Sequence, residues 1–209
     1  MVGGRVSPSE STESEGGDAR SRLWTVPNLL SGLRLVLAPL LLYLAWTGAG
    51  TLFLVALSTS LLSDLCDGWF ARRYDQATHL GTLLDSWGDL ATYATVPLCA
   101  WWLWPDLIRR EAWYVAAIVS AYTFPIVLGY LKYGRLTSYH TYGAKLSAVL
   151  MGASALALFA GGPALPFRVS TWVLVLAELE EIAITTILPV WRTNVPSILH
   201  ARRLLGEPR

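Results

Sequence analysis

Charged residues are scarce in this chain of 209 residues, at 15% of the sequence, and the formal net charge is only +1. Such a balance gives no global attraction to nucleic acid, so no nucleic-acid partner is expected. Cysteine is rarer still, with Cys66 and Cys99 both in apolar segments. These two residues support neither a structural disulfide nor a thiolate metal cluster.

Apolar residues are abundant instead. They make up 54% of the chain, and the mean hydropathy is +0.44, which is typical of a polytopic membrane protein. Residues 1–20 are the exception, because they are rich in Ser, Glu and Gly and predict a disordered cytoplasmic tail rather than a signal peptide. We expect residues 21–209 to form one transmembrane domain.

The apolar residues fall into six stretches of roughly 20 residues each. The sequence predicts spans near residues 31–47, 52–70, 80–104, 113–131, 144–159 and 169–190. Residues 21–30 mix polar, proline and apolar residues, which predicts a short interfacial helix before the first span. The predicted fold class is therefore all-α: six transmembrane helices and a short N-terminal interfacial helix.

Basic residues predict the orientation in the membrane. One set of connections holds Arg20, Arg22, Arg72, Arg73, Lys132, Arg135, Lys145, Arg192, Arg202 and Arg203, whereas the opposite set holds Arg109, Arg110 and Arg168. By the positive-inside rule, both termini and residues 64–89 are predicted to face the cytoplasm. The protein is expected to lie in the cytoplasmic membrane.

Acidic residues inside this apolar pattern need an explanation, because a buried carboxylate is costly unless it is paired or bound to metal. At about 100° per residue, Asp64 and Asp67 lie about 60° apart on a helix, with Gly68 and Ala71 on the same face.

A second acidic face follows, where Gly81, Asp85 and Asp89 recur every four residues. Two such helices can converge on one site. Arg72 and Arg73 could pair with these acids, but two basic residues cannot neutralise four acids, so a metal site is favoured. Hard ions such as Mg²⁺ prefer carboxylate oxygens, and paired metals stabilise phosphoryl displacement.

Small residues on the acidic faces leave room for a ligand to approach the backbone, although close helix packing is an alternative role for them. The same residues form the pattern D-x2-D-G-x2-A-R-x8-G-x3-D-x3-D, with eight specified positions at fixed spacing. This pattern resembles the signature of the CDP-alcohol phosphotransferase family.

The resemblance implies roles for each position. Asp64, Asp67, Asp85 and Asp89 would bind two divalent ions, Mg²⁺ or Mn²⁺, and Asp89 would also be the general base. The CDP group would lie beside Asp64, Gly68, Ala71, Arg72 and Gly81, with Arg72 on the diphosphate. The resemblance also implies a homodimer.

The implied reaction transfers a phosphatidyl group from CDP-diacylglycerol to a small hydroxyl acceptor and releases CMP. We expect a phosphorylated polyol, with glycerol 3-phosphate ahead of inositol phosphate; inositol, serine, or a CDP-choline or CDP-ethanolamine donor are alternatives. From a different class, a divalent-cation transporter would use the acids as a pathway, but it leaves Gly68, Ala71 and Arg72 unexplained. A scaffold without activity is a third alternative.

A basic loop predicts where an anionic acceptor would bind. Lys132, Arg135 and Lys145, with His140 between them, lie on the same predicted side as the aspartates. Topology alone also predicts basic residues here, so an anchoring role is equally supported.

Two further polar groups have no firm role from sequence. Asn28, Ser31 and Arg34 resemble the start of the first span in the family, and they either line the cytoplasmic mouth or cap and anchor the helix. Glu178, Glu180 and Glu181 fall inside the last predicted span, so they are expected to face protein or water.

Overall fold

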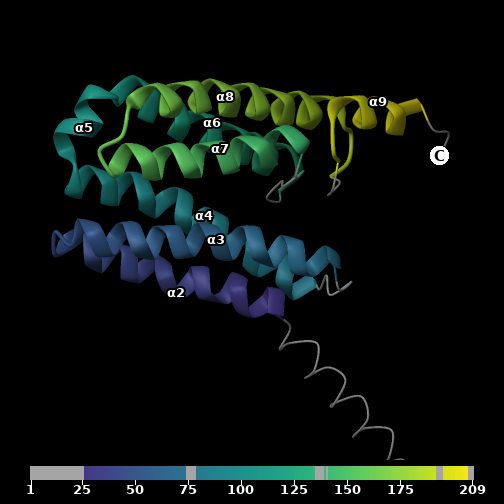
Figure 1. Ribbon diagram of the computed structural model, residues 1–209. Helices are drawn as coiled ribbons and strands as arrows, with labels where there is room; N and C mark the ends of the chain where they lie inside the picture. Colours follow the sequence, from purple (N-terminus) through teal and green to yellow (C-terminus); the bar gives the residue numbers. More distant parts are fainter. Residues whose placement is uncertain (1–25, 74–78, 135–138, 140, 192–194, 207–209) are drawn as a thin grey trace, which may run out of the picture. The chain divides into compact units, whose positions relative to one another are not determined.

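The computed structural model describes residues 26–73, 79–134, 139, 141–191 and 195–206. These residues form helices and connections without any strand, which confirms the all-α prediction. The helices are α2 (Val26–Trp46), α3 (Gly50–Arg73), α4 (His79–Leu103), α5 (Pro105–Arg110), α6 (Ala112–Tyr133), α7 (Tyr142–Phe159), α8 (Ala164–Ile187) and α9 (Ile198–Gly206) (Figure 1).

Each predicted span overlaps one long helix, namely α2, α3, α4, α6, α7 or α8. Within the described residues, three helices are long and apolar enough to cross a membrane: Asn28–Trp46, Ala112–Tyr133 and Tyr142–Phe159. Gly50–Cys66 is a shorter apolar helix. A membrane protein is therefore supported, while the number of six spans stays a prediction.

The helices differ from the prediction at the start of α2 and in two additional short helices. Helix α2 begins at Val26, so residues 26–30 continue into the first span instead of forming a separate interfacial helix. Residues 21–25 lie outside the described part of the chain. The short helices α5 and α9 were not predicted.

The chain divides into two compact units, of which the first combines Met1–Leu41 with Ala56–Thr92. Among the described residues of this unit, buried polar side chains come from α2 and α3. They are Asn28, Ser31 and Arg34 in α2 and Ser60 and Ser63 in α3, while Thr92 of α4 is half-buried. The Ser63 hydroxyl donates to the Ser60 carbonyl (2.8 Å), and the Thr92 hydroxyl donates to the Gly88 carbonyl (2.9 Å), so these hydroxyls are satisfied within their own helices.

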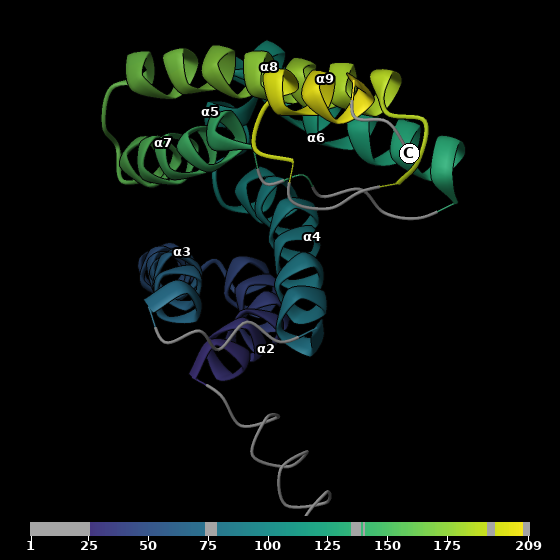
Figure 2. The ribbon, with the colours of Figure 1, turned by 90° about the vertical axis from the view of Figure 1, so that its right-hand side faces the viewer.

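The second unit combines Leu42–Val55 with Tyr93–Arg209, and in it α8 packs against both α6 and α7 (Figures 1 and 2). Met151, Leu158, Phe167 and Leu174 form a buried apolar cluster between these helices. Ser147 and Ser154 of α7 are buried and donate to carbonyls three residues earlier, so α7 presents small, satisfied side chains. Such residues allow close helix packing inside a membrane.

The C-terminal end of α8 is capped by the end of α6. Lys132 Nζ donates to the carbonyls of Thr185 (2.7 Å) and Thr186 (3.0 Å), and the Tyr133 hydroxyl lies 2.7 Å from the Leu188 carbonyl. The last carbonyls of a helix have no partner within it, and a positive charge is favoured at this end. These contacts fix α6 to α8.

The three glutamates of α8, which were expected to face protein or water, are all at least partly buried. Glu178 is buried, and Glu180 and Glu181 are half-buried. Glu180 Oε1 accepts a hydrogen bond from the backbone N–H of Ile198 (3.0 Å) at the start of α9. An acidic side chain at a helix N-terminus satisfies an N–H group that the helix leaves open.

An ion pair joins the start of α6 to the first turns of α8. The Glu111 carboxylate accepts from Arg168 Nε and Nη2, each at 2.8 Å, and the Glu111 side chain is 1% exposed whereas that of Arg168 is 42% exposed. The hydrogen bonds from Arg168 hold the pKa of the Glu111 carboxyl below its ordinary value, with coulombic attraction to Arg168 and Arg110 adding to the effect.

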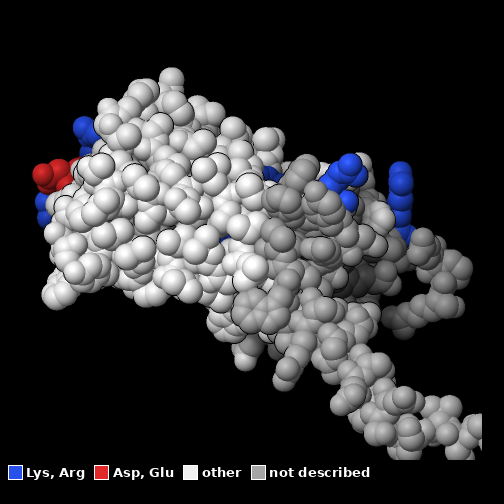
Figure 3. Space-filling model, turned by 60° about the horizontal axis from the view of Figure 1, so that its bottom comes forward, with Lys and Arg blue, Asp and Glu red and all other residues white. Residues whose placement is uncertain are grey.

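Most of the described surface in Figure 3 carries neither acidic nor basic side chains. Large apolar side chains are exposed along α6, where Trp113 is 88% exposed and Phe124, Val127 and Leu131 are exposed as well. A surface of this kind suits contact with lipid.

Breaking the Glu111 pair tests its contribution. We expect Glu111→Gln to lower the free energy of unfolding by about 1–3 kcal/mol near neutral pH, because Arg168 loses a charged partner but keeps access to solvent. The folded-state pKa is lowered, so this contribution is complete above the unfolded pKa of about 4.3 and is lost as the pH falls through the folded value. Thermal unfolding in detergent across this pH range measures the difference.

The matched control is Asp106→Asn, which removes a carboxylate that is 95% exposed and pairs with Arg109 within its own turn. Its effect should be within about 0.5 kcal/mol. A Glu111→Gln protein as stable as this control would contradict the assignment.

Cysteine labelling tests the predicted six-span topology. Single cysteines placed at Gln76 and at Asp106, with Cys66 and Cys99 replaced by alanine, should react with an impermeant thiol reagent from opposite sides of the membrane. Gln76 should react from the cytoplasm. Reaction of both from one side would exclude the six-span arrangement.

Candidate functional site

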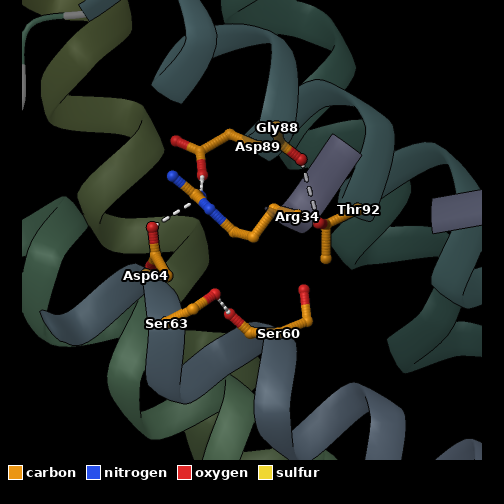
Figure 4. Close-up of polar contacts among 7 residues, drawn as sticks. All are labelled: Arg34, Ser60, Ser63, Asp64, Gly88, Asp89 and Thr92. Atoms are coloured by element: carbon orange, nitrogen blue, oxygen red, sulfur yellow. Dashed lines mark hydrogen bonds and ion pairs between the residues drawn. The ribbon is translucent and has the colours of Figure 1, made fainter. Parts of the chain in front are cut away.

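A buried arginine lies at the centre of the first unit. Arg34 is the only charged residue of α2, and its side chain is 2% exposed. Its Nη1 atom lies 2.5 Å from Asp64 Oδ1 of α3 and 2.6 Å from Asp89 Oδ1 of α4 (Figure 4). One cation thus joins carboxylates from two helices to a third helix.

The two carboxylates are more open than the arginine. The side chain of Asp64 is 35% exposed and that of Asp89 is 31% exposed, so both can be approached by a ligand while Arg34 lies behind them. The structure therefore brings together two of the residues that the sequence predicts for the site.

The other predicted members of the acidic site lie on the same two helices. Asp67, Gly68, Ala71 and Arg72 belong to the last turns of α3, and Gly81 and Asp85 belong to the first turns of α4. Gly81 is half-buried. The side chains of Asp67, Arg72 and Asp85 lie outside the described part of the structure, so their positions stay predictions.

Gly88 is a residue that sequence reasoning missed. A Cβ atom added there would lie 3.4 Å from both Cζ and Nε of Arg34, so the backbone of α4 packs directly against the guanidinium. A glycine in a helix interior costs about 1 kcal/mol relative to alanine, and an alanine Cβ here would meet the guanidinium at ordinary van der Waals distance.

Sequence reasoning also missed the pairing of Arg34 with the acids. The sequence offered Arg72 and Arg73 as their partners and left Arg34 as an anchor or a mouth residue. The signal was present, because a lone charge in an apolar helix needs a partner from another helix. Counting Arg34, three basic residues still fall short of four acids, and the metal site stays a prediction.

The chemistry of the donors fits a divalent ion. Two carboxylate oxygens from different helices lie within 2.6 Å of one positively charged nitrogen, so these acids are placed to share a cation. Oxygen donors suit Mg²⁺ and Mn²⁺. The described side chains include no group of three or more His, Cys, Asp or Glu placed to hold an ion, and Asp67 and Asp85 lie outside that comparison.

The predicted acceptor residues belong to the second unit. The ammonium group of Lys132 binds two carbonyls of α8, and Lys145 is exposed in the first turn of α7. Arg135 and His140 lie outside the described residues.

Comparison with known proteins identifies the family. The sequence profile of the CDP-alcohol phosphatidyltransferase family matches residues 24–179. The chain belongs to this family. The match includes Arg34 and all four aspartates of the CDP-alcohol phosphatidyltransferase signature, and it ends within α8.

Several curated proteins are similar to parts of this chain. A Mycobacterium tuberculosis protein named putative cardiolipin synthase is 36% identical over 101 residues, which are 44% of this chain and 48% of that protein. An Aquifex aeolicus CDP-diacylglycerol–glycerol-3-phosphate 3-phosphatidyltransferase is 44% identical over 64 residues, covering 31% of this chain and 36% of that protein.

A Drosophila melanogaster protein named probable cardiolipin synthase (CMP-forming) aligns over a longer range. It is 28% identical over 178 residues, covering 83% of this chain and 50% of that protein. The chain thus spans half or less of the length of these curated relatives. No solved structure matches it.

Proposed function

We propose that this protein is a membrane enzyme that transfers a phosphatidyl group from CDP-diacylglycerol to a hydroxyl of a glycerol phosphate acceptor and releases CMP. The observation that carries the proposal is the meeting of Asp64 and Asp89 on Arg34, inside the family signature. The site faces the cytoplasm, and the protein forms a homodimer in the cytoplasmic membrane.

Asp64, Asp67, Asp85 and Asp89 would hold two Mg²⁺ or Mn²⁺ ions. When bound, such ions offset the negative charge of the diphosphate and of the departing CMP. Arg72 binds the diphosphate through its guanidinium fork, next to the small residues Gly68, Ala71 and Gly81 that leave space for the nucleotide.

The chemistry needs a base within reach of the acceptor. The acceptor oxygen attacks the phosphorus that carries diacylglycerol, a new P–O bond forms, and the P–O bond to CMP breaks. Asp89 accepts the hydroxyl proton, and its partial exposure gives an acceptor access to it. These residues require no covalent enzyme intermediate.

The names of the relatives reduce the number of candidate acceptors. One names glycerol 3-phosphate, and others name cardiolipin, in which two phosphatidyl groups are joined by glycerol. A CMP-forming synthesis of cardiolipin from CDP-diacylglycerol uses phosphatidylglycerol, which contains the same glycerol phosphate unit. The longer alignment with a cardiolipin synthase favours phosphatidylglycerol, with glycerol 3-phosphate second. Lys145 carries the proposed contact to the acceptor phosphate, together with Arg135, because Lys132 already binds α8.

A CMP-release assay identifies the acceptor. Purified protein in mixed micelles with CDP-diacylglycerol and Mn²⁺ would receive phosphatidylglycerol, glycerol 3-phosphate, inositol phosphate, inositol or serine in turn. We expect CMP release with phosphatidylglycerol as acceptor. Glycerol 3-phosphate is the second candidate, and CMP release with it would identify a water-soluble acceptor. Release with CDP-choline as donor, or with none of these acceptors, would contradict the proposal.

Replacing the aspartates tests the machinery. Asp85→Asn and Asp89→Asn each remove a charge with little change of volume, so we expect kcat to fall at least about 100-fold while the protein stays folded in detergent. The exposed Asp106→Asn is the matched control and should keep full activity. CMP release near the wild-type rate from either site variant would show that the site is assigned wrongly.

A further inference from the structure

Helix α9 (Ile198–Gly206) lies beyond residue 179, where the match to the family profile ends. It is fixed to the rest of the second unit. Ala201 is 0% exposed, and Ile198 packs against the apolar cluster that contains Ala201. The Glu180 carboxylate of α8 accepts the Ile198 N–H at 3.0 Å. One side of α9 is therefore held against protein.

The start of α9 lies level with the ends of two helices that are long and apolar enough to cross a membrane. Tyr133 ends α6, and its hydroxyl donates to the Leu188 carbonyl (2.7 Å). Tyr142 begins α7, and its N–H donates to the Pro196 carbonyl (3.3 Å), two residues before α9. The connection from α8 to α9 is thus bonded to the ends of both candidate spans. The ends of a span lie near the lipid headgroups, so α9 begins at that depth.

The opposite side of α9 combines an apolar side chain with positive charge. Leu199 is 66% exposed, and the exposed Arg203 follows four residues later, so both occupy one face of the helix. Arg202 is exposed on the flank of this face. Interfacial helices have this composition, because the apolar side chain enters the edge of the hydrocarbon while the charged groups stay among the headgroups.

The positive charge of α9 is not neutralised within the described structure. The exposed Arg109 and Arg110, at the other end of α6, lie 3.0 Å and 3.6 Å from carboxylate oxygens. By contrast, Arg202 and Arg203 have no acidic partner among the described residues, and residues 195–206 contain no Asp or Glu. Two adjacent guanidinium groups without a carboxylate attract an external anion.

We propose that the outward face of α9, formed by Leu199, Arg202 and Arg203, lies in the headgroup layer of the membrane and binds the phosphate groups of anionic lipids. A guanidinium matches a phosphate group through paired hydrogen bonds. Each basic residue at an anionic membrane surface raises the affinity about fivefold. This surface belongs to the second unit, and the inference does not rest on the proposed reaction.

The test measures which lipids surround α9. Full-length protein with Cys66→Ala, Cys99→Ala and His200→Cys is labelled with a fluorophore at position 200, which is exposed in α9, and is reconstituted into nanodiscs. Phosphatidylglycerol or phosphatidylcholine with a nitroxide near the headgroup is included at equal mole fraction in phosphatidylcholine discs, and quenching is recorded. We expect phosphatidylglycerol to be enriched at least about fivefold around the fluorophore. High salt should reduce this preference.

Three variants of the labelled protein separate the contributions. Arg202→Gln combined with Arg203→Gln should abolish the preference while both lipids still quench, because Leu199 keeps its contact with lipid. Leu199→Gln should lower quenching by both lipids and keep the preference. The matched control combines Arg109→Gln with Arg110→Gln, two adjacent exposed arginines that lie near carboxylates, and it should keep the preference.

Three results would overturn the inference. Quenching by neither lipid would show that another protein, a second copy or water covers this face. Equal quenching by the two lipids before any arginine is replaced would exclude binding of anionic headgroups. A preference that survives in the double variant of Arg202 and Arg203, with only a lower temperature of unfolding, would limit the arginines to stabilising the C-terminal end of α9.

Gel filtration and thermal unfolding verify that each variant is folded. Should the double variant of Arg202 and Arg203 not fold, the salt dependence of the preference decides, and a preference unchanged by high salt overturns the inference. No readout uses CMP release, so the proposed function is tested separately.

Discussion

A permanent positive charge buried in an apolar helix is the constraint on which the first unit depends. Arg34 cannot lose its proton, and α2 supplies no acid of its own. Without a partner, such a charge is strongly destabilising away from water. The partners must come from α3 and α4, and the 2.5 Å and 2.6 Å contacts to Asp64 and Asp89 supply them. Both contacts use Arg34 Nη1, which joins α2 to α3 and to α4, and α4 packs against the guanidinium at Gly88, where an added Cβ would lie 3.4 Å from Cζ and Nε.

In the second unit, too, polar and charged side chains that are shielded from water find partners in other helices. Its buried or half-buried polar groups mostly satisfy helix ends or each other: Lys132 binds the last carbonyls of α8, Glu180 accepts from the first N–H of α9, and Glu111 pairs with Arg168. Each of these contacts gives a partner to a polar group that is shielded from water. In the first unit the sequence places four aspartates against Arg34, Arg72 and Arg73, so an excess of negative charge remains. That excess is the basis for proposing a cation site here in place of a set of structural ion pairs.

The helices were predictable because long apolar runs have few alternatives, and each predicted span overlaps one helix. Helix α5 was missed because six residues are too few to give a periodic pattern, although Pro105 at its start is a known signal. The need of Arg34 for a partner could be deduced from its isolation in α2, but the identity of the partner depends on which helices are neighbours. The role of Gly88 was hidden for the same reason, since a glycine next to Asp89 gains meaning only when Arg34 is known to lie against it.

The difference in exposure across the site has a thermodynamic consequence for the proposed function. The acids stand about one third exposed in front of a buried arginine, so an approaching diphosphate meets negative charge first. The three arginines of this region, Arg34, Arg72 and Arg73, do not balance the four aspartates together with a diphosphate. Under the proposed function, nucleotide binding would therefore be favoured by added positive charge, and by linkage bound nucleotide and bound divalent ions would raise each other's affinity by the same factor. In that proposal Arg34 would weaken this coupling, because each positive charge fixed in the protein reduces the charge that ions and nucleotide would have to compensate for each other.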